Sequence, residues 1–240
     1  MARLFDGVDD RILTSTLPST ATDNLTMGGW FYFDSLATDT EVTLYNGDSG
    51  ANGYGMGLQA GTSNLQLLLG GIVWAIGGAI SAGAWMHLVL RRSSTTWQIY
   101  KDGAALGSTT TTNPVAPSGV GFYIGDSLQR DSANLPKRAA EVFFFERALD
   151  VSEIAVLADG FSPSFLQPTN RKLYWQLIGR SSPEINMWST NTGTVTGAVQ
   201  AEHPRIIYPY KRKTYFLPQS LYIPVVNHKI FTTKVIQGVY

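Results

Sequence analysis

The sequence predicts an all-β fold: an antiparallel β-sandwich of the jelly-roll type with one short helix and an extended C-terminal arm. Up to Arg147, short segments rich in aromatic and β-branched residues alternate with turn-forming residues. One segment has helical periodicity. After His203-Pro204, prolines and aromatic residues alternate without a periodic pattern. These observations divide the chain into a sandwich over residues 1–160, a linker with a small β-rich extension over 161–204, and an arm over 205–240.

The expected strands follow one another at the spacing of an antiparallel sandwich. They cover residues 30–33, 42–45, 64–69, 72–76, 87–92, 96–100, 121–126 and 141–146. Asn46-Gly47 predicts a two-residue hairpin, because both residues tolerate positive φ. Asp102-Gly103 predicts a second turn.

One helix is expected between Asp150 and Gly160. Asp150 can cap it, and Glu153, three residues later, completes a capping box. Gly160 is typical of a helix end, and the apolar residues between have helical spacing. Beyond the helix, residues 172–177 and 190–197 predict two further β segments.

Composition and charge narrow the classes of protein. Without cysteine the chain can form no disulfide and has no thiolate nucleophile. Glycine pairs interrupt the longest apolar run, residues 65–80, so we expect no membrane span. Residues 1–160 hold 9 Lys/Arg against 16 Asp/Glu, whereas residues 161–240 hold 9 against 2. The basic part either meets an acidic partner, such as nucleic acid, a neighbouring subunit or this chain's own sandwich, or is solvated.

The sequence does not favour an enzyme. A glycoside hydrolase needs two carboxylates on one face, but Glu141 and Glu146 are five residues apart, which places them on opposite faces of a regular strand. There is no Gly-x-Ser-x-Gly nucleophile motif, and no two of the three histidines have metal-ligand spacing. His87, in an alternating strand, is interpreted as structural. We expect no catalytic residue and no organic cofactor.

Four segments in order carry a family resemblance: residues 5–10 (Phe-Asp-Gly-Val-Asp-Asp), 85–90 (Trp-Met-His-Leu-Val-Leu), 100–103 (Tyr-Lys-Asp-Gly) and 147–154 (Arg-Ala-Leu-Asp-Val-Ser-Glu-Ile). Over residues 1–160 the chain resembles the laminin-G-like, concanavalin-A-like jelly-roll family. The resemblance implies calcium at the rim of the sandwich, with oxygen donors from Asp6, Asp9, Asp10 and Asp126. The alternative is that Asp6 and Asp9 stabilise a tight turn. Residues 139–141 (Ala-Ala-Glu) depart from the family, which often has an aspartate pair there.

The segments after the sandwich suggest a context. Residues 174–179 (Tyr-Trp-Gln-Leu-Ile-Gly), 181–184 (Ser-Ser-Pro-Glu), 194–197 (Thr-Val-Thr-Gly) and 201–204 (Ala-Glu-His-Pro) resemble a layout found in tailed-phage virion proteins. The resemblance implies a non-enzymatic virion protein with a structural or binding role, and the absence of cysteine suits assembly in the reducing host cytoplasm. We expect a capsid decoration or cement protein. The alternative is a carbohydrate-binding host-adhesion module of a tail or fibre, to which Trp74, Trp85 and Trp97 could contribute, although core packing is the other role for each.

The arm is the expected contact with partners. We expect it to bind other capsid or tail subunits. We also expect the protein to form a homo-oligomer, with a trimer as the expected state. Extended segments bind through main-chain pairing and aromatic anchors. Nucleic acid is disfavoured, since the basic cluster spans only three residues. The predicted contact residues are Arg205, Tyr208, Tyr210, Lys211, Arg212, Lys213, Tyr215, Phe216, Tyr222, Phe231 and Tyr240.

Overall fold

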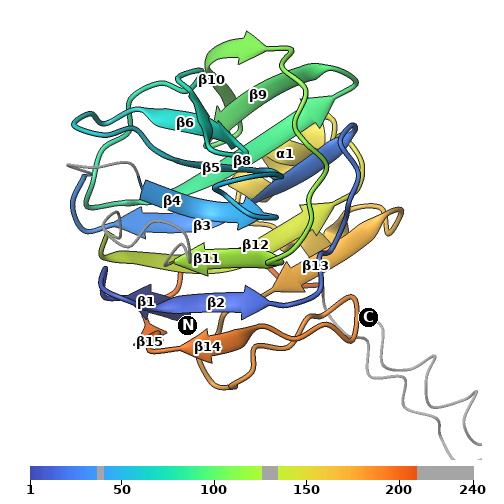
Figure 1. Cartoon of the computed structure of the whole chain (residues 1–240). Coiled ribbons are helices and arrows are strands. Elements are labelled where there is room, and N and C mark those ends of the chain that lie inside the picture. The colour runs from blue at the N-terminus through green and yellow to red at the C-terminus, as the bar shows by residue number, and fades with distance from the viewer. Residues whose placement is uncertain (37–40, 126–134, 210–240) are drawn as a thin grey trace, which may run out of the picture. The chain divides into compact units, whose positions relative to one another are not determined.

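The computed structural model describes residues 1–36, 41–125 and 135–209. Within them two antiparallel sheets pack face to face, and a single α-helix lies outside them (Figure 1). The all-β sandwich predicted from the sequence is therefore confirmed. No helix in these ranges is long and apolar enough to cross a membrane.

The larger sheet, sheet A, contains the strands that carry most of the features described below. They are β1 (Ala2–Phe5), β3 (Leu25–Phe33), β8 (Trp85–Ser93), β9 (Thr96–Lys101), β10 (Ala104–Thr110), β12 (Lys137–Phe145), β13 (Arg171–Trp175) and β15 (Val199–Ala201). Their order across the sheet is β10-β9-β8-β3-β12-β1-β15, and β13 pairs with β12 beside this path.

Sheet B forms the other layer and faces the viewer in Figure 1. Its strands are β2 (Arg11–Thr14), β4 (Glu41–Asn46), β5 (Tyr54–Leu58), β6 (Leu65–Leu69), β7 (Ile72–Trp74), β11 (Phe122–Gly125) and β14 (Thr194–Thr196). They lie in the order β14-β2-β11-β4-β5-β6-β7. Because consecutive strands often lie in different sheets, most pairings join residues far apart in the sequence.

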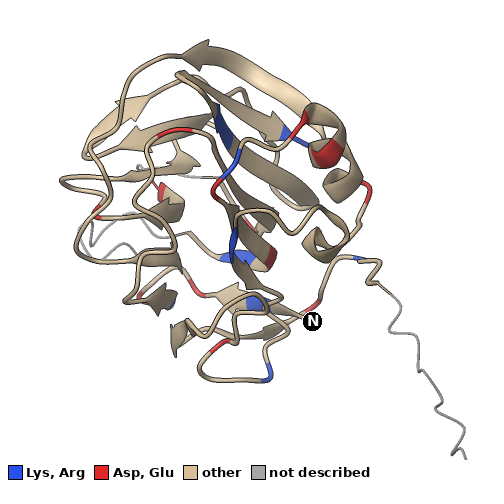
Figure 2. Cartoon of the chain, turned by 90° about the vertical axis from the view of Figure 1, so that its right-hand side faces the viewer, with Lys and Arg blue, Asp and Glu red and all other residues tan. Residues whose placement is uncertain are grey.

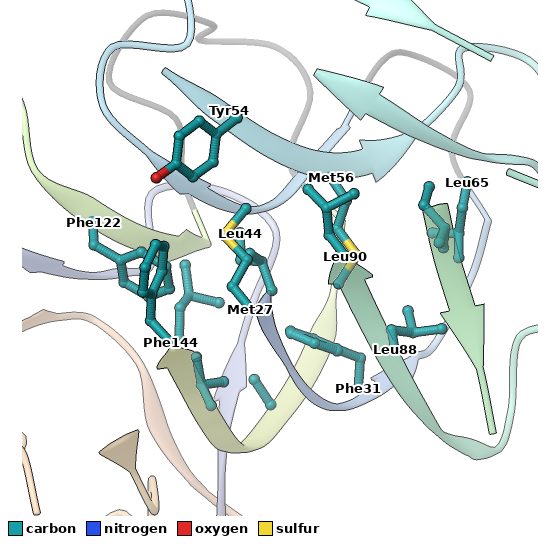
Figure 3. Close-up of a cluster of buried hydrophobic side chains, with 14 of the residues drawn as sticks. Met27, Phe31, Leu44, Tyr54, Met56, Leu65, Leu88, Leu90, Phe122 and Phe144 are labelled. Atoms are coloured by element: carbon teal, nitrogen blue, oxygen red, sulfur yellow. The ribbon is translucent and has the colours of Figure 1, made fainter. Parts of the chain in front are cut away.

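The core lies between the two sheets (Figure 3). Alternate residues of each strand point into it, as the two-residue period of a β-strand requires. From sheet A these include Met27, Phe31, Leu88, Leu90 and Phe144, and from sheet B Leu44, Tyr54, Met56, Leu65 and Phe122. Side chains of this size contribute about 1.5–3 kcal/mol each when fully buried.

The connection after β4 differs from the prediction. The two-residue hairpin expected at Asn46-Gly47 is wrong, since residues 47–53 separate β4 from β5. Asn52 organises this longer loop: its Oδ1 accepts the backbone N–H groups of Asp48 at 3.2 Å and Ser118 at 2.7 Å. A tertiary contact thus outweighed the local turn signal. The predicted Asp102-Gly103 turn is confirmed between β9 and β10.

Strand β5 was not predicted, because its glycines obscured the β pattern. Gly55 and Gly57 leave room for β4: a Cβ at Gly57 would lie 1.7 Å from the carbonyl oxygen of Glu41. A Cβ at Gly55 would lie 2.3 Å from the Tyr45 ring. Glycine here marks the close approach of two strands.

Helix α1 (Val151–Ala158) packs on the outer face of sheet A, on the far side of β8 in Figure 1. The predicted capping box is confirmed, with Glu153 accepting the backbone N–H of Asp150 at 2.9 Å. Arg147 binds both oxygens of the same carboxylate at 2.7 Å and lowers the pKa of Glu153 below its ordinary value. The helix and a short 3-10 turn, η1 (Pro163–Phe165), cover a second apolar cluster on this face. That cluster contains Val89, Tyr100, Phe143, Phe145, Leu149, Ile154, Leu157, Leu166 and Tyr174.

Residues 161–209 are part of the sandwich in the structure. The predicted β segments at 172–177 and 190–197 correspond to β13, which pairs with β12, and β14, which pairs with β2. An unpredicted strand, β15, pairs with β1. Met1–Pro209 consequently form one compact unit, so the stretch expected as linker and extension contributes strands to both sheets.

A β-bulge interrupts β12 where its neighbour changes. Residues 137–139 pair with β1, whereas residues 142–145 pair with β13. Glu141 lies between the two, with a left-handed φ of 54°, and the register against β3 shifts at this point. Its backbone N–H donates to the carbonyl of Gln176 at 3.3 Å. Bulges often redirect a side chain, and this one places Glu141 in a polar cluster described below.

Candidate functional site

The predicted metal ligands Asp6 and Asp9 lie together in the turn between β1 and β2. With Asp10 they place carboxylate oxygens within 4.8 Å of one another, whereas Asp126 lies outside the described residues. The Asp6 carboxylate accepts the N–H of Val8 at 2.8 Å, and Asp10 accepts the N–H of Asp6 at 2.8 Å. The turn-stabilising alternative is therefore confirmed for Asp6.

The fit of this turn to calcium is incomplete. Carboxylate oxygens at this spacing suit a hard cation with ligand distances of about 2.3–2.6 Å. However, Asp10 is buried and one of its oxygens contacts Gly197, where a Cβ would lie 1.6 Å away. Burial raises the pKa of Asp10; the hydrogen bond from Asp6 opposes this, and the charges of Asp6 and Asp9 raise it further. Asp6 and Asp9 would provide the accessible oxygens for an ion, and calcium stays a prediction.

A row of side chains crosses the outer face of sheet A, close to this turn. It contains one residue from each of five neighbouring strands, and we call it the aromatic row: Trp85, Tyr32, Arg138, Leu4 and Val199. Each is the register partner of the next. Their neighbours along the strands, such as Met86, Phe31 and Phe5, point into the core, so the row faces outward. All five side chains are at least partly exposed.

The row has two aromatic rings beside an ion pair. The rings of Tyr32 and Trp85 meet edge to face with centroids 5.9 Å apart. The Arg138 guanidinium lies 4.4 Å from the Tyr32 ring centroid, and its Nη2 lies 3.1 Å from Asp34 Oδ1. A further partly exposed ring, Trp30, lies on the same face. Rings and hydrogen-bonding groups are therefore exposed side by side.

Trp30 packs against a buried histidine. The rings of Trp30 and His87 are 5.4 Å apart, and burial lowers the pKa of His87 to about 3, against the opposing charge of Asp102. His87 is therefore neutral at physiological pH, in line with the structural role expected for it.

The acidic turn and the aromatic row lie at the same end of the sandwich. Gly7 of the turn packs against Pro136, where an added Cβ would be 2.7 Å from the proline ring. The carbonyl of Pro136 accepts the N–H of Asp34 at 3.1 Å, and the Asp34 side chain forms the ion pair with Arg138. A short chain of contacts thus joins the two features.

Of the three tryptophans proposed from the sequence, only Trp85 belongs to the row. Trp97 is fully buried and donates its Nε1–H to the carbonyl of Thr112 at 2.9 Å. Trp74 packs against the core between the sheets. Sequence reasoning missed Trp30, Tyr32 and Arg138. The alternation over residues 30–33 could have placed Trp30 and Tyr32 on the face opposite Phe31, but nothing local indicated Arg138.

The two glutamates considered as a catalytic pair have separate surroundings. The buried carboxylate of Glu141 accepts the hydroxyls of Tyr174 and Tyr208. The Glu146 carboxylate accepts Ser19 Oγ at 2.5 Å and pairs with Lys172 at 3.1 Å. Among the described residues, no hydrogen-bond or ion-pair partner of Glu141 is also a partner of Glu146.

The described part of the predicted arm contacts its own sandwich. Tyr208 donates its hydroxyl to Glu141 at 2.7 Å, whereas the Arg205 side chain is exposed. The other predicted contact residues, from Tyr210 to Tyr240, lie outside the described residues. Elsewhere in the described chain, charged residues are scattered over the sandwich (Figure 2).

Comparison with known proteins identifies the fold. A model of the concanavalin A-like lectin/glucanases superfamily matches residues 6–155. A Bacteroides ovatus structure proposed to bind carbohydrate superimposes with a TM-score of 0.63 at 14% identity, covering 86% of this chain and 62% of that protein. A heptameric pentraxin from Limulus polyphemus gives 0.56 at 15% identity, covering 82% and 93%.

A more distant likeness links the chain to an enzyme. A Trypanosoma rangeli sialidase gives a TM-score of 0.52 at 21% identity, covering 65% of this chain but only 27% of the sialidase. At these identities all three structures show the fold alone. No curated protein sequence matches the chain.

Proposed function

The chain belongs to the concanavalin A-like lectin/glucanases superfamily, and we propose that it is a non-enzymatic carbohydrate-binding protein whose ligand lies on the aromatic row. The observation that carries the proposal is the outward-facing set of Trp85, Tyr32 and Arg138 on neighbouring strands. Sugars combine apolar C–H faces with hydroxyls, so they suit a surface that combines rings with a few fixed polar groups.

The polar groups of the row are available to a ligand. The Arg138 and Asp34 side chains are 27% and 34% exposed, and an ion pair of this exposure contributes only about 0–1 kcal/mol. Rearranging it toward a ligand therefore costs little. Arg138 donates hydrogen bonds and Asp34 accepts them, which matches adjacent sugar hydroxyls.

The proposal excludes hydrolysis at the two glutamates. A retaining or inverting glycosidase needs both carboxylates beside the scissile bond. Glu141 is only 1% exposed, and its described partners are tyrosine hydroxyls and a histidine rather than an open space. The superfamily includes both lectins and glucanases, and the burial of Glu141 supports binding rather than cleavage for this chain.

Replacing Trp85 by alanine should weaken glycan binding by about tenfold or more, equivalent to roughly 1.4 kcal/mol. The variant loses one of the two aromatic rings of the row, and no side chain of the core changes. Glycan-array screening of Met1–Pro209, followed by calorimetric titration of the best ligand, measures the effect. We expect roughly micromolar affinity for the unmodified protein.

Trp74→Ala is the matched control, since Trp74 is also partly buried but lies in sheet B. Its glycan affinity should equal that of the unmodified protein. Equal affinities for Trp85→Ala and the unmodified protein, or an array without any ligand, would refute the proposal.

We also propose a second role, as a virion structural component such as a capsid decoration protein. Two observations favour it: the basic excess of residues 161–240, and the docking of residues 203–208 on the sandwich just before the basic cluster at 211–213. On this proposal residues 210–240 contact other capsid or tail subunits, and several copies assemble on the particle.

Ending the chain at Pro209 tests this second role. The shortened protein should fold, because Met1–Pro209 form a compact unit, yet it should no longer sediment with phage particles. Its glycan binding should be unchanged, which separates the two proposals. Undiminished sedimentation with particles would contradict the structural role.

A further inference from the structure

Glu141 occupies an unusual position for a carboxylate. It lies in the middle of a sheet strand, almost fully buried, with a left-handed backbone. A residue other than glycine is strained in this conformation, and such strain persists only where its surroundings maintain it. A buried charge also requires partners. Both costs must be offset by specific contacts between Glu141 and its surroundings.

The partners of Glu141 come largely from one short segment. Residues 202–208, which we call the strap, contribute the hydroxyl of Tyr208, which donates to Glu141 Oε1 at 2.7 Å. The Nε2 of His203 lies 3.2 Å from the same oxygen and forms an ion pair with it only when the imidazole is protonated. The other carboxylate oxygen accepts the hydroxyl of Tyr174, which is also 2.9 Å from Ser162 Oγ. One buried carboxylate thus joins the strap to β12 and β13.

Backbone hydrogen bonds fix the strap at a second place. The N–H of Ile207 donates to the carbonyl of Gly160 at 2.8 Å, and the N–H of Ser162 donates to the carbonyl of Ile207 at 2.9 Å. Yet Ile207 and Tyr208 are 43% and 40% exposed. Little apolar area holds the strap, so Glu141 contributes a large share of its attachment.

The two tyrosines remain donors at all physiological pH values. Burial raises the pKa of both Tyr174 and Tyr208, and the charge of Glu141 raises each further. Both hydroxyls therefore stay protonated and able to donate to the Glu141 carboxylate.

We propose that Glu141 is an intramolecular anchor that holds the strap on the outer face of sheet A. The anchor determines whether the chain beyond Pro209 starts from a fixed point on the sandwich or from a free segment. Loss of the carboxylate detaches the strap while both sheets stay folded, because the other contacts of β12 do not pass through it. The inference is independent of glycan binding.

Trypsin cleavage after Arg205 reports on the strap. The Arg205 side chain is exposed, but a protease needs several residues around the bond to detach before it cuts, so the rate follows the detached population. In Glu141→Gln, an amide NH2 group replaces one acceptor oxygen. It then faces a tyrosine hydroxyl that had donated to that oxygen. Cleavage at this bond, followed by mass spectrometry, should accelerate roughly tenfold or more.

Two further variants separate detachment from unfolding. Glu141→Gly removes the carboxylate but accepts positive φ without strain, and Tyr208→Phe changes the strap alone. Both should accelerate cleavage while the thermal midpoint of the sandwich, measured by tryptophan fluorescence, stays close to that of the unmodified protein. Glu146→Gln, the same change at the residue that follows β12, should leave the cleavage rate unchanged.

Unchanged cleavage in Tyr208→Phe and Glu141→Gly would overturn the proposal, as would cleavage of the unmodified protein at the rate of a free peptide covering residues 200–209. Faster cleavage at Arg205 that occurs only together with a lowered thermal midpoint would also overturn it, since the carboxylate would then support the fold and not the strap.

Discussion

Replacing Glu41 by glutamine is expected to lower the free energy of unfolding by about 3–5 kcal/mol at pH 7. Glu41 of β4 and Lys137 of β12 form an ion pair between the two sheets, and their side chains are 0% and 1% exposed. Lys137 also donates to the carbonyl of Val42 at 3.0 Å, and Thr43 donates to the carboxylate at 2.9 Å. Removing the carboxylate charge leaves Lys137 buried without a counter-ion, so this side chain must either stay charged without a partner or lose its proton on folding.

The stability of the Glu41→Gln variant should rise with pH. Burial lowers the pKa of Lys137 from 10.5 to about 7, and in Glu41→Gln no carboxylate opposes this shift. The folded variant then binds fewer protons than its unfolded chain between about pH 7 and 10, so its stability rises over this range. Urea unfolding at pH 7 and pH 9.5 measures the change.

Two further variants test whether the loss of stability comes from the buried ion pair. The double variant Glu41→Gln/Lys137→Met should recover much of the loss, because no charge is then buried. Asp34→Asn, which breaks the exposed pair with Arg138, should cost no more than about 1 kcal/mol. A cost for Glu41→Gln as small as that of Asp34→Asn would show that the buried pair contributes little.

The sequence predicted those features whose signals are local. The strands around Trp30, His87 and Phe143 combine aromatic and β-branched residues, and Asp150 with Glu153 forms a capping box within four positions. Each signal depends on neighbours along the chain, so each could be interpreted without knowing the tertiary structure. A tight turn was one of the two roles considered for Asp6 and Asp9, and the structure shows the turn-stabilising hydrogen bond at Asp6.

Features that depend on distant pairings could not be predicted. Glu41 and Lys137 are almost one hundred residues apart, and nothing in the sequence around either one distinguishes it from an exposed charged residue. The aromatic row requires the registers of five strands, and a shift of one residue would turn any member inward. The anchoring proposed for Glu141 requires a bulge at the point where the pairing partner of β12 changes from β1 to β13.

A shift of one residue in register would also turn Trp175 out of the core. Trp175→Ala should lower the free energy of unfolding by about 3–5 kcal/mol. Trp175 of β13 is fully buried in the core between the sheets. Its ring meets that of Phe122 from sheet B edge to face at 5.6 Å, and Gly193 packs against it with space for no Cβ. Thermal or urea unfolding measures the loss, and Trp85→Ala, which changes a partly exposed tryptophan on sheet A, should lower the free energy of unfolding far less.

The same packing predicts the outcome of shortening the chain. Sequence patterns favoured a sandwich complete at residue 160, but β13, β14 and β15 supply strands to both sheets beyond that point. A chain ending at 160 would expose Phe122, Phe144 and the edge of β12 to water, whereas a chain ending at Pro209 would lose none of these contacts. We therefore expect cooperative unfolding for residues 1–209 and none for residues 1–160. A cooperative transition in the shorter chain would mean that the extension only decorates a domain that is already stable.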